Sequence, residues 1–484
     1  MNEKLDRFLN ALSAGRDNVK IDSRKVSRGD IFVALRGTVC DGHDHIKRAF
    51  AAGASGVVAE REVSGLTDPE KKKVLVVSDT LEALEHIAGR IFERPSSRLE
   101  TYGVTGTNGK TTSVFLADSV LNSSGRKCGF LSTVFNKTCG DDLKRASMTT
   151  ADLITLNRML WEMASCGKKA AVVEISSHAL DQGRVRGLEL DGAVFTNLTP
   201  EHLDYHRCME DYLLAKAKIF KMLKPSGTAA LNADDPMVAG LEPGIKVGRV
   251  VMFGLGPKAE VRATDLRLMS DSTEFVISAE GLGRTNVKTG LIGTHNVYNM
   301  LGVTALLISS GLDLGTIVKG LEAVKHVPGR LDAVSSKAPF GVYVDYAHTP
   351  NALENVLKAM RTLSDKKLIC VFGCGGDRDR TKRPVMGRIA SDICDHVVIT
   401  SDNPRSEKPA DILDEIRKGI SARSNYSIIE DRTEAIRKSL GMARKGDVVV
   451  IAGKGHEDHQ IIGELKTHYD DKEVAANILN EMGF

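Results

Sequence analysis

The chain of 484 residues has no Cys-x-x-Cys pair, although it contains eight cysteines. Because zinc knuckles and small disulfide-stapled domains use closely spaced cysteines, this scatter argues against both kinds of site. No run of about 18 apolar residues occurs, so we expect no membrane-spanning helix. The first residues, MNEKLDRFLN, are too charged to form the apolar core of a signal peptide. These absences predict a soluble cytoplasmic protein with reduced cysteines.

An excess of charge of either sign is also missing. Lys and Arg total 66 against 63 for Asp and Glu, which leaves a net charge of +3. This balance gives no reason to expect nucleic acid or a membrane surface as a partner. Repeats and low-complexity tracts are absent as well. An apolar fraction of 42% is enough for real cores, and the length suggests about three domains.

The most informative stretch that is present is GVTGTNGKTT at residues 103–112. A strand-like run enters a glycine-bearing loop, and a helix-like segment follows until Gly125. Backbone N–H groups of such a loop and helix N-terminus bind phosphate oxygens. Lys110 can reach the outer phosphates, and the Thr111 hydroxyl can hold magnesium. The segment therefore predicts a nucleoside triphosphate site, with an ordinary strand-turn-helix as the alternative.

The spacing of this loop departs from the standard P-loop. Val104 stands where the standard motif has its first glycine, and Gly106 instead precedes Gly109 by three positions. We therefore expect a variant form of the phosphate-binding loop.

The pattern of predicted strands and helices changes twice along the chain. A linker-like ERPSS at 93–97 and the VPGR at 327–330 mark the changes. They divide the chain into predicted domains 1–98, 99–328 and 329–484. Short apolar runs predict strands at 31–35, 56–59, 74–77, 171–175, 193–196, 342–345, 368–372, 396–400 and 447–451. Residues 247–292 alternate like strands, and helices are expected at 296–310, 351–363 and 410–420.

These patterns predict an α/β protein of three domains. The central domain is expected to contain a P-loop ATPase-type sheet. In the last domain, apolar strands alternate with helices, which is typical of a Rossmann-like, doubly wound parallel sheet. Its strands are followed by YAHTP, GCGGDRD, SDNPRSE and AGKGHED. Because ligands bind at the carboxyl ends of parallel strands, these loops predict a site, although ordinary solvated loops are the alternative.

A second group of polar residues lies in the central domain. Glu174 ends an apolar strand, where a buried carboxylate is costly unless it is paired or metal-bound. His202 follows in TNLTPEHLDYH, and with Thr111 and Glu174 it offers ligands suited to a magnesium–nucleotide site. His206 in the same motif is interpreted as structural. Lys216 and Lys218 lie two positions apart on a predicted helix, so one can point inward while the other is solvated.

Several of these motifs together resemble the Mur ligase family. They are GTNGKTT, EISSH, TNLTPEHLDYH, GTHNVYN and DYAHTP, and the resemblance runs from about residue 21 to residue 457. GTNGKTT alone would indicate only the wider superfamily, which includes folylpolyglutamate synthase. The variant loop spacing is the family's own form. The resemblance implies a nucleotide-sugar domain, a central ATPase domain and a C-terminal amino-acid domain.

The resemblance also implies an activity. ATP would phosphorylate the free D-glutamate carboxylate of UDP-N-acetylmuramoyl-L-alanyl-D-glutamate, and the amine of meso-2,6-diaminopimelate would attack the acyl phosphate. This is an ADP-forming step of peptidoglycan precursor synthesis, with ATP and magnesium as the implied cofactors and a monomer expected. The implied catalytic residues are Lys110, Glu174, His202 and Lys216. The implied metal ligands are Thr111, Glu174, His202 and a carbamylated Lys216, with an unmodified lysine contacting phosphate as the alternative.

Other family positions match residue by residue. The implied ATP contacts are Gly106, Thr107, Asn108, Gly109, Lys110, Thr111, Thr112, Asn296, Asn299, Arg330 and Asp345. The implied contacts to the UDP-sugar-peptide are Ile21, Ser23, Thr149, Thr150, Ser176, Gln182 and Arg184, together with the loop Thr38-Val39-Cys40. Asp345 could accept from a ribose hydroxyl, with a turn-capping aspartate as the alternative. Arg184 suits a phosphate or a carboxylate, with a solvated arginine as the alternative.

Specificity for the amino acid rests on Asp402-Asn403-Pro404-Arg405, which resembles the diaminopimelate-adding form of the family. Diaminopimelate has one more carboxylate than lysine, and Arg405 can clamp it bidentately. Glu457 and Asp402 can take the distal ammonium, Arg378 the other carboxylate, and Gly453 can supply backbone contacts. The alternatives are a lysine-adding ligase, a folylpolyglutamate synthase-like ligase, a P-loop kinase or ATPase, and a non-enzymatic scaffold.

Overall fold

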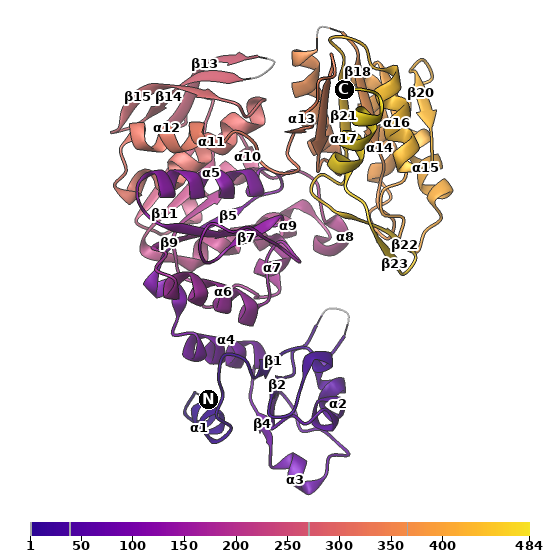
Figure 1. The fold of residues 1–484 in the computed structure, drawn as a ribbon. Helices are drawn as coiled ribbons and strands as arrows, with labels where there is room; N and C mark the ends of the chain where they lie inside the picture. The colour runs from indigo at the N-terminus through magenta and orange to yellow at the C-terminus, as the bar shows by residue number, and fades with distance from the viewer. Residues whose placement is uncertain (1, 38–39, 270–271, 365) are drawn as a thin grey trace. The chain divides into compact units, whose positions relative to one another are not determined.

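A computed structural model describes residues 2–37, 40–269, 272–364 and 366–484 (Figure 1). The chain forms two compact units. The first contains residues 1–103, 126–191 and 218–224, and the second contains residues 104–125, 192–217 and 225–484. No helix in the described part of the chain is both long and apolar enough to cross a membrane. The domain limits near residues 98 and 328 stay predictions.

The first unit begins with a small parallel sheet. Its strands, in spatial order, are β1 (Val19–Lys20), β2 (Ile31–Val33), β3 (Gly56–Ala59) and β4 (Val74–Val76). Each neighbouring pair is parallel. The helices that follow or precede these strands are α1 (Asn2–Ala11), α2 (Ile46–Ala51), α3 (Asp68–Lys71) and α4 (Thr80–Ile91). One apolar core contains residues of α1 and α4, and a second contains residues of α2. The three strands predicted here are confirmed.

The rest of the first unit surrounds the strand that carries Glu174. That strand, β9 (Ala170–Glu174), pairs in parallel with β6 (Cys128–Leu131). Two short antiparallel strands continue from β6, namely β7 (Phe135–Lys137) and β8 (Lys144–Arg145). The helices are α6 (Leu153–Ser165) and α7 (Ser177–Asp181).

A disulfide joins Cys139 after β7 to Cys166 at the end of α6, with a Cα–Cα distance of 5.7 Å. The expectation that all cysteines are reduced is therefore wrong at this pair. The two cysteines are 27 residues apart in sequence. A search for closely spaced cysteines does not detect them, because the fold and not the spacing brings them together.

The phosphate-binding loop opens the second unit. It follows β5 (Glu100–Thr105), which begins in the first unit, and precedes α5 (Lys110–Ser123). Helix α5 packs closely on α12 (Leu314–Ala323), where Ser119 Oγ donates to the Gly320 carbonyl at 2.7 Å. A Cβ at residue 320 would lie 2.4 Å from Val120 Cα, so only glycine permits this approach.

The part of the second unit that precedes the C-terminal sheet contains both parallel and antiparallel strands. Strand β12 is parallel to both β11 and β13, whereas β13, β14 and β15 are antiparallel. The strands are β10 (Leu190–Phe195), β11 (Leu223–Asn232), β12 (Arg249–Gly254), β13 (Val261–Leu268), β14 (Thr273–Ala279) and β15 (Gly283–Thr289). Strands β10 and β11 begin in the first unit. The helices are α8 (Leu203–His206), α9 (Met209–Ala217), α10 (Pro236–Ala239) and α11 (Thr294–Leu307). The alternating pattern at 247–292 and the apolar helix after it are thus confirmed.

The C-terminal part of the second unit is a doubly wound sheet, as predicted. Its strands, in spatial order, are β16 (Asp332–Ala333), β17 (Gly341–Asp345), β21 (Val448–Ala452), β18 (Leu368–Phe372), β19 (His396–Ile399) and β20 (Tyr426–Ile428). All pairs are parallel except β16–β17.

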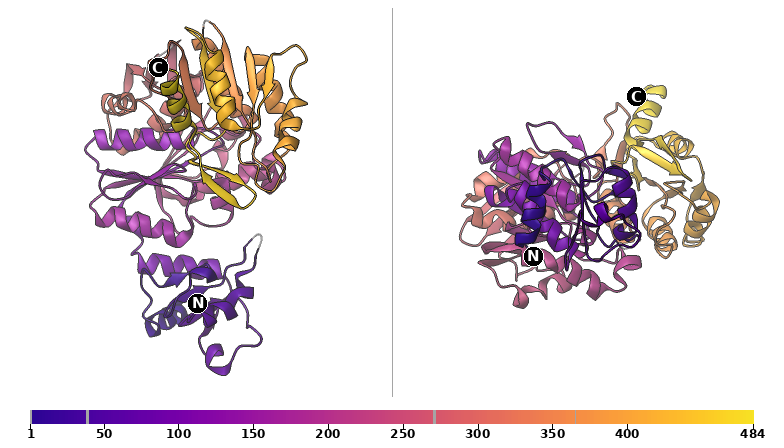
Figure 2. Two further views of the ribbon diagram at one scale, coloured as in Figure 1. Left: turned by 45° about the vertical axis from the view of Figure 1, so that its right-hand side comes forward. Right: turned by 90° about the horizontal axis from the view of Figure 1, so that it is seen from below.

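Helices cover both faces of this sheet (Figure 2). One apolar core includes α13 (Pro350–Leu363), α14 (Lys382–Ile393) and α15 (Pro409–Arg417). The other includes α16 (Arg432–Met442) and α17 (Asp471–Glu481). The hairpin of β22 (His459–Ile462) and β23 (Leu465–His468) lies between β21 and α17 in the chain.

A buried ion pair supports the carboxyl edge of this sheet. Arg432 and Asp471 are both fully buried, with Arg432 Nη2 at 2.6 Å from Asp471 Oδ2. The same guanidinium donates to the carbonyls of Ser401 and Ala452 at 3.1 Å each. One side chain thereby fixes the ends of β19 and β21, immediately before Asp402 and Gly453.

We expect Arg432→Met to lower the free energy of unfolding by about 3–5 kcal/mol, because it leaves the Asp471 carboxylate buried without its partner. The double variant Arg432→Met/Asp471→Leu should recover much of this loss, because it removes both charges. Urea unfolding followed by circular dichroism measures the difference. Arg437→Met is the matched control, because Arg437 pairs with Glu481 at the surface, and it should cost less than about 1 kcal/mol. Equal losses for the Arg432 and Arg437 variants would contradict the assigned role.

Candidate functional site

The phosphate-binding loop is built around two glycines with positive φ. Gly106 has φ 144° and Gly109, the N-cap of α5, has φ 85°. A Cβ at Gly106 would lie 1.9 Å from Thr196 Oγ1, and a Cβ at Gly109 would lie 2.1 Å from Asn299 Oδ1. The loop thus requires glycine both for its backbone conformation and for the close approach of its neighbours.

Asn108 at the tip of the loop is held by side chains from two other segments. Asn197 Oδ1 accepts from the Asn108 N–H at 2.9 Å, and Thr196 Oγ1 donates to the Asn108 carbonyl at 2.6 Å. The Asn108 side chain donates to Asn351 Oδ1 of α13 at 3.1 Å. Asn197 of the TNLTPEH motif and Asn351, which follows DYAHTP, therefore both contact the loop.

Two lysines converge on one carbonyl of the loop. Lys110 Nζ donates to the carbonyls of Gly106 at 3.0 Å and Thr107 at 2.7 Å. Lys216 Nζ donates to the same Gly106 carbonyl at 2.7 Å. Its ammonium also lies 4.6 Å from the centre of the Tyr212 ring, whose hydroxyl contacts Thr107 Oγ1 at 3.3 Å.

The two lysines of α9 and the turn after it differ as expected. Lys216 is 1% exposed. Lys218 lies on the surface and pairs with Asp181 at 2.7 Å. The prediction that one lysine points inward and the other is solvated is confirmed, and the buried one is the residue that the family resemblance selects.

The start of the C-terminal part also reaches the loop. Arg330 Nη2 donates to Thr111 Oγ1 at 3.1 Å, and its guanidinium lies 4.7 Å from the centre of the Tyr346 ring. Asp345 accepts from the N–H groups of Leu331 and Ala347, each at 2.7 Å. These contacts are those of a turn-capping aspartate, and burial raises the pKa of its carboxyl.

Asn296 and Asn299 are buried side by side in α11. Asn299 Nδ2 donates to Asn296 Oδ1 at 3.1 Å, and Asn296 Nδ2 donates to the Ile292 carbonyl at 2.9 Å. Since a Cβ at Gly109 would lie 2.1 Å from Asn299 Oδ1, Asn299 lies close beside the loop. Contacts of either asparagine with adenine or ribose stay a prediction.

Glu201 lies beside predicted site residues, and the sequence interpretation missed it. Its Oε1 lies 3.5 Å from His348 Nε2 and 3.8 Å from His202 Nε2. Burial alone raises the pKa of Glu201, but the hydrogen bond with His348 and the charges of His202 and Lys110 lower it overall. Its position directly before His202 in TNLTPEHLDYH was the available signal.

The two histidines of that motif have different surroundings. His202 has φ 56°, and its side chain is 42% exposed. His206 is buried, with its ring centre 5.1 Å from that of Tyr212. These surroundings agree with the interpretation of His206 as structural.

In the first unit, the residues assigned to the sugar and peptide gather around Glu174. Thr133 donates to Glu174 twice, from its N–H at 3.0 Å and from its hydroxyl at 2.8 Å. The Thr133 hydroxyl also lies 3.1 Å from Thr149 Oγ1. Thr150 Oγ1 donates to the Glu174 carbonyl at 2.9 Å. Thr133, which sequence reasoning did not select, is thus the group that satisfies the buried carboxylate.

The same cluster continues toward the surface. Ser176 caps α7 by accepting from the Ala179 N–H at 3.2 Å, and its own N–H donates to Thr150 Oγ1. Arg184 donates to the Thr150 carbonyl at 3.4 Å and to Gln182 Oε1 at 2.5 Å. All five predicted residues of this group therefore lie together. Glu174 belongs to the first unit, whereas Thr111, His202 and Lys216 belong to the second, so their common metal site stays a prediction.

The predicted contacts in the N-terminal sheet are more scattered. Ser23 is buried at the start of a short turn that Asp22 caps. Ile21 packs against the core of the first sheet. Cys40 Sγ lies 2.9 Å from His45 Nε2. Thr38 and Val39 lie outside the described residues.

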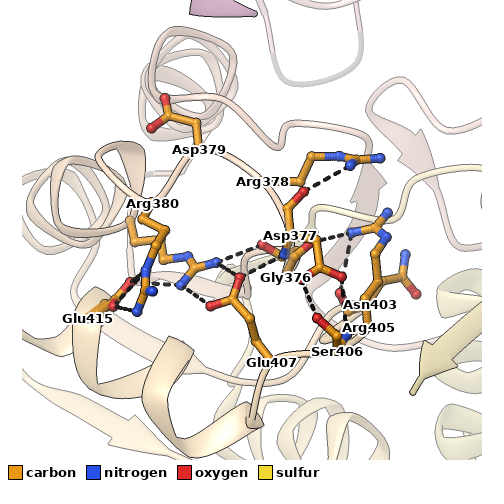
Figure 3. A network of polar contacts seen from close by, with 12 residues as sticks. Gly376, Asp377, Arg378, Asp379, Arg380, Asn403, Arg405, Ser406, Glu407 and Glu415 are labelled. Carbon is orange, nitrogen blue, oxygen red and sulfur yellow. Dashed lines mark hydrogen bonds and ion pairs between the residues drawn. The ribbon is translucent and has the colours of Figure 1, made fainter. Parts of the chain in front are cut away.

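In the C-terminal sheet, the loops GCGGDRD and DNPRSE meet (Figure 3). Arg405 has φ 53°, and its Nη1 donates to the Gly376 carbonyl at 2.8 Å. Burial and the neighbouring charge of Arg378 lower the pKa of the Arg405 guanidinium. A Cβ at Gly376 would lie 1.9 Å from the Pro404 carbonyl oxygen, so this glycine is what lets the two loops approach.

The other predicted residues of this edge also come together. Asn403 Nδ2 donates to Glu457 Oε2 at 2.8 Å. A Cβ at Gly453, where φ is 115°, would lie 2.6 Å from Asp402 Oδ2. The ring centre of Tyr346, after β17, lies 4.7 Å from that of His456, after β21. The four loops after β17, β18, β19 and β21 thus include groups in mutual contact, as the parallel-sheet argument predicted.

A charged network that was not predicted holds the two loops. Arg383 is fully buried and donates to Glu407 at 2.8 Å and 2.9 Å and to Glu415 at 2.7 Å. Glu407 also accepts from the Asp377 N–H at 2.7 Å, and Ser406 Oγ donates to Asp377 Oδ1 at 2.5 Å (Figure 3). The hydrogen bonds from Arg383 lower the pKa of the Glu407 carboxyl to about 2. The backbone around Arg405 is therefore fixed by ion pairs from outside the DNPR motif.

Comparison with known proteins agrees with this architecture. The family called Mur ligase, catalytic domain, matches residues 17–91. The Mur ligase middle domain matches residues 104–307, and the Mur ligase glutamate ligase domain matches residues 329–455.

Named relatives match over nearly the whole chain. The chain is similar to the UDP-N-acetylmuramoyl-L-alanyl-D-glutamate–2,6-diaminopimelate ligase of Bacillus cereus, with 41% identity covering 96% of this chain and 94% of the relative. It is 40% identical to ligase 1 of the same name from Clostridium acetobutylicum, covering 99% and 98% of the two chains. A solved structure of a ligase of that name aligns with a TM-score of 0.67 and 32% identity over 96% of this chain and 95% of the other. The sequence motifs, the three-part α/β architecture and these matches together establish that the chain belongs to the Mur ligase family of ATP-dependent ligases.

Proposed function

We propose that the protein joins meso-2,6-diaminopimelate to UDP-N-acetylmuramoyl-L-alanyl-D-glutamate, with ATP converted to ADP and phosphate. The observation that carries the amino-acid assignment is the DNPR loop, where Arg405 lies half-buried beside Arg378. The relatives that bear this name are about 40% identical to the chain. The product is a precursor of peptidoglycan, whose synthesis in the cytoplasm fits a chain with no membrane-spanning helix among its described residues.

The first step is phosphoryl transfer. A carboxylate oxygen of the D-glutamate attacks the γ-phosphorus of ATP, and ADP leaves. The loop around Gly106 and Gly109 surrounds the triphosphate with N–H groups, and Lys110 brings positive charge to it. Lys110 Nζ donates to the loop carbonyls of Gly106 and Thr107, so its charge is positioned before the substrates bind.

The second step forms the amide bond. The amine nitrogen of the amino acid attacks the carbonyl carbon of the acyl phosphate and loses a proton. The tetrahedral intermediate then collapses, and inorganic phosphate leaves with the electrons of the former C–O bond. The C-terminal loops orient the amine for this attack, and orientation of this kind is a large part of such catalysis.

Magnesium fits the residues assigned to it by the chemistry of their donors. Thr111 offers a hydroxyl, Glu174 a carboxylate and His202 an imidazole, and a carbamate on Lys216 would add anionic oxygens. The ion would supply charge neutralisation for the phosphoryl groups. An unmodified Lys216 ammonium would repel it, which is why we include carbamylation in the proposal.

Recognition of the nucleotide-sugar peptide is assigned to the first unit. Thr149, Thr150 and Ser176 present hydroxyl groups beside Glu174, and Arg184 adds a cation at the edge of the same cluster. A guanidinium of this kind suits a phosphate or a carboxylate. Ser23 and Ile21 would contribute contacts from the N-terminal sheet.

Two related activities are the alternatives. A lysine-adding ligase would leave the Arg405 guanidinium without the carboxylate that it is placed to bind, which costs binding energy. A folylpolyglutamate synthase-like ligase shares the phosphate-binding loop. It is disfavoured by the DNPR loop and by the parallel sheet that β1 to β4 form before the central part of the chain.

An ADP-release assay tests the reaction and the role of Arg405 together. The wild type should release ADP only when the UDP-dipeptide and an amino acid are both present, and it should prefer meso-diaminopimelate to lysine. Arg405→Ala should lower kcat/KM for diaminopimelate by ~100-fold or more and change kcat/KM for lysine much less, because only diaminopimelate loses an ion pair. Arg388→Ala, on the exposed side of α14, is the matched control. An unchanged preference in the Arg405 variant would refute its assigned role.

The role of Lys216 has a matched control two residues away. Lys216→Ala should lower ADP release by ~100-fold or more, because it removes a group that stabilises the transferred phosphate. Lys218→Ala should have little effect, because Lys218 lies at the surface, where it pairs with Asp181. If Lys216 is carbamylated, wild-type activity should fall in carbonate-free buffer and return with bicarbonate. Thermal melting checks that both variants fold, and similar activity of the two folded variants would contradict the proposal.

A further inference from the structure

Lys454 is a fully buried lysine among the residues of the proposed amino-acid site. It follows Gly453 at the end of β21, and its side chain is 0% exposed. Sequence reasoning selected its neighbours Gly453 and Glu457 but not Lys454 itself. Because an ammonium is costly to bury without partners, its surroundings must compensate its charge.

The ammonium of Lys454 meets polar groups from three segments. Lys454 Nζ donates to Asn403 Oδ1 at 2.9 Å and to the His459 carbonyl at 2.8 Å. Asp402 Oδ1 lies 3.9 Å away and Glu457 Oε2 lies 3.7 Å away. The cation is therefore held by direct hydrogen bonds to neutral oxygens, while the two carboxylates lie just beyond hydrogen-bond distance.

These contacts fix which way the Asn403 amide points. Its Oδ1 accepts from Lys454 Nζ and from the Ile461 N–H at 3.0 Å. Its Nδ2 therefore faces the other way and donates to Glu457 Oε2 at 2.8 Å. A flipped amide would direct its NH₂ group at two other donors, so Lys454 and Ile461 together determine this orientation.

Lys454 also changes the charge of the site. Asp402 and Glu457 are the carboxylates assigned to the distal ammonium of the amino acid. Burial alone raises the pKa of Asp402, but the charges of Lys454 and Arg432 lower it overall. The charged or titratable groups that act on Asp402 or Lys454 are Arg432, His348, Arg405, Glu457, Asp471 and the Tyr469 ring.

We propose that Lys454 is a positioning residue for amino-acid binding: it orients Asn403 and keeps Asp402 ionised beside Glu457, so that the two carboxylates accept the ammonium of a diamino acid. The inference rests on the proposed function. It adds a buried cation to the DNPR residues as a determinant of affinity for the amino acid.

The experiment separates this role from simple structural support. Steady-state ADP release gives KM for meso-diaminopimelate, ATP and the UDP-dipeptide between about pH 6 and about pH 8.5. The variants are Lys454→Met, which keeps the length without the charge, and Lys454→Arg, which keeps the charge. Lys466→Met is the matched control, because Lys466 is exposed on β23 of the adjacent hairpin.

We expect Lys454→Met to raise KM for diaminopimelate by ~10-fold or more, with kcat and the other two KM values within about twofold of the wild type. The increase should be largest at low pH. Without the lysine charge the pKa of Asp402 rises, so a proton neutralises the carboxylate as the pH falls. Lys454→Arg should keep the pH profile of the wild type, and Lys466→Met should keep all its constants.

Three results would overturn the inference. One is a diaminopimelate KM in Lys454→Met equal to that of Lys466→Met. Another is the same pH profile in the Met and Arg variants, which would make the charge irrelevant. The last is loss of folding in both variants by thermal melting, which would make the role structural. A wild type without ADP release in the presence of diaminopimelate would refute the proposed function instead, so the two failures are distinguishable.

Discussion

The phosphate-binding loop depends on one constraint: the ammonium groups of two lysines both lie at the carbonyl oxygen of Gly106. Lys110 and Lys216 both donate to the Gly106 carbonyl, and two ammonium groups so close repel each other. Helices α5 and α9 hold the two lysines from different parts of the chain. The Thr107 carbonyl accepts from Lys110, and the Tyr212 ring lies beside the Lys216 ammonium, so both contacts offset the repulsion. An anionic ligand at this place relieves the repulsion, and so would a carbamate on Lys216. The affinity of the loop for phosphate is thus prepared by the packing of the free protein.

A corresponding principle organises the C-terminal sheet. The loops at its carboxyl edge contain many charged residues, and most of the supporting ones form ion pairs with one another. Arg432 and Asp471 form the deepest layer, below the ends of β19 and β21. Arg383 with Glu407 and Glu415 fixes the backbone on either side of Arg405. Because these ion pairs satisfy the supporting groups, the charges of Arg405 and Arg378 are available to the proposed amino-acid site.

Sequence reasoning predicted the parts of the molecule that short-range patterns determine. Apolar runs located β2, β3, β9, β18 and β21, and the glycine-lysine loop was found because glycine and lysine have specific uses beside phosphate. It missed residues whose role depends on a partner far along the chain. Thr133 is unremarkable in sequence until the fold brings it to Glu174. In sequence Lys454 resembles a surface lysine, but the fold buries it at the end of β21, where it donates to the first residue of β22. Cys139 and Cys166 come together only because the fold places the end of α6 beside Cys139. Glu201 lay inside a recognised motif, but its two histidine neighbours come from different segments.

The tight crossing of α5 and α12 has a consequence for natural variation. Gly320 lies on the helix that supports α5, and any larger residue there would meet the Val120 backbone. Since α5 begins at Lys110, displacement of its middle would tilt its first turn and spread the amide groups of the proposed triphosphate site. A mutation at a site that touches no substrate would therefore present as a defect in ATP use, and a genetic survey would misread a packing lesion as a catalytic one.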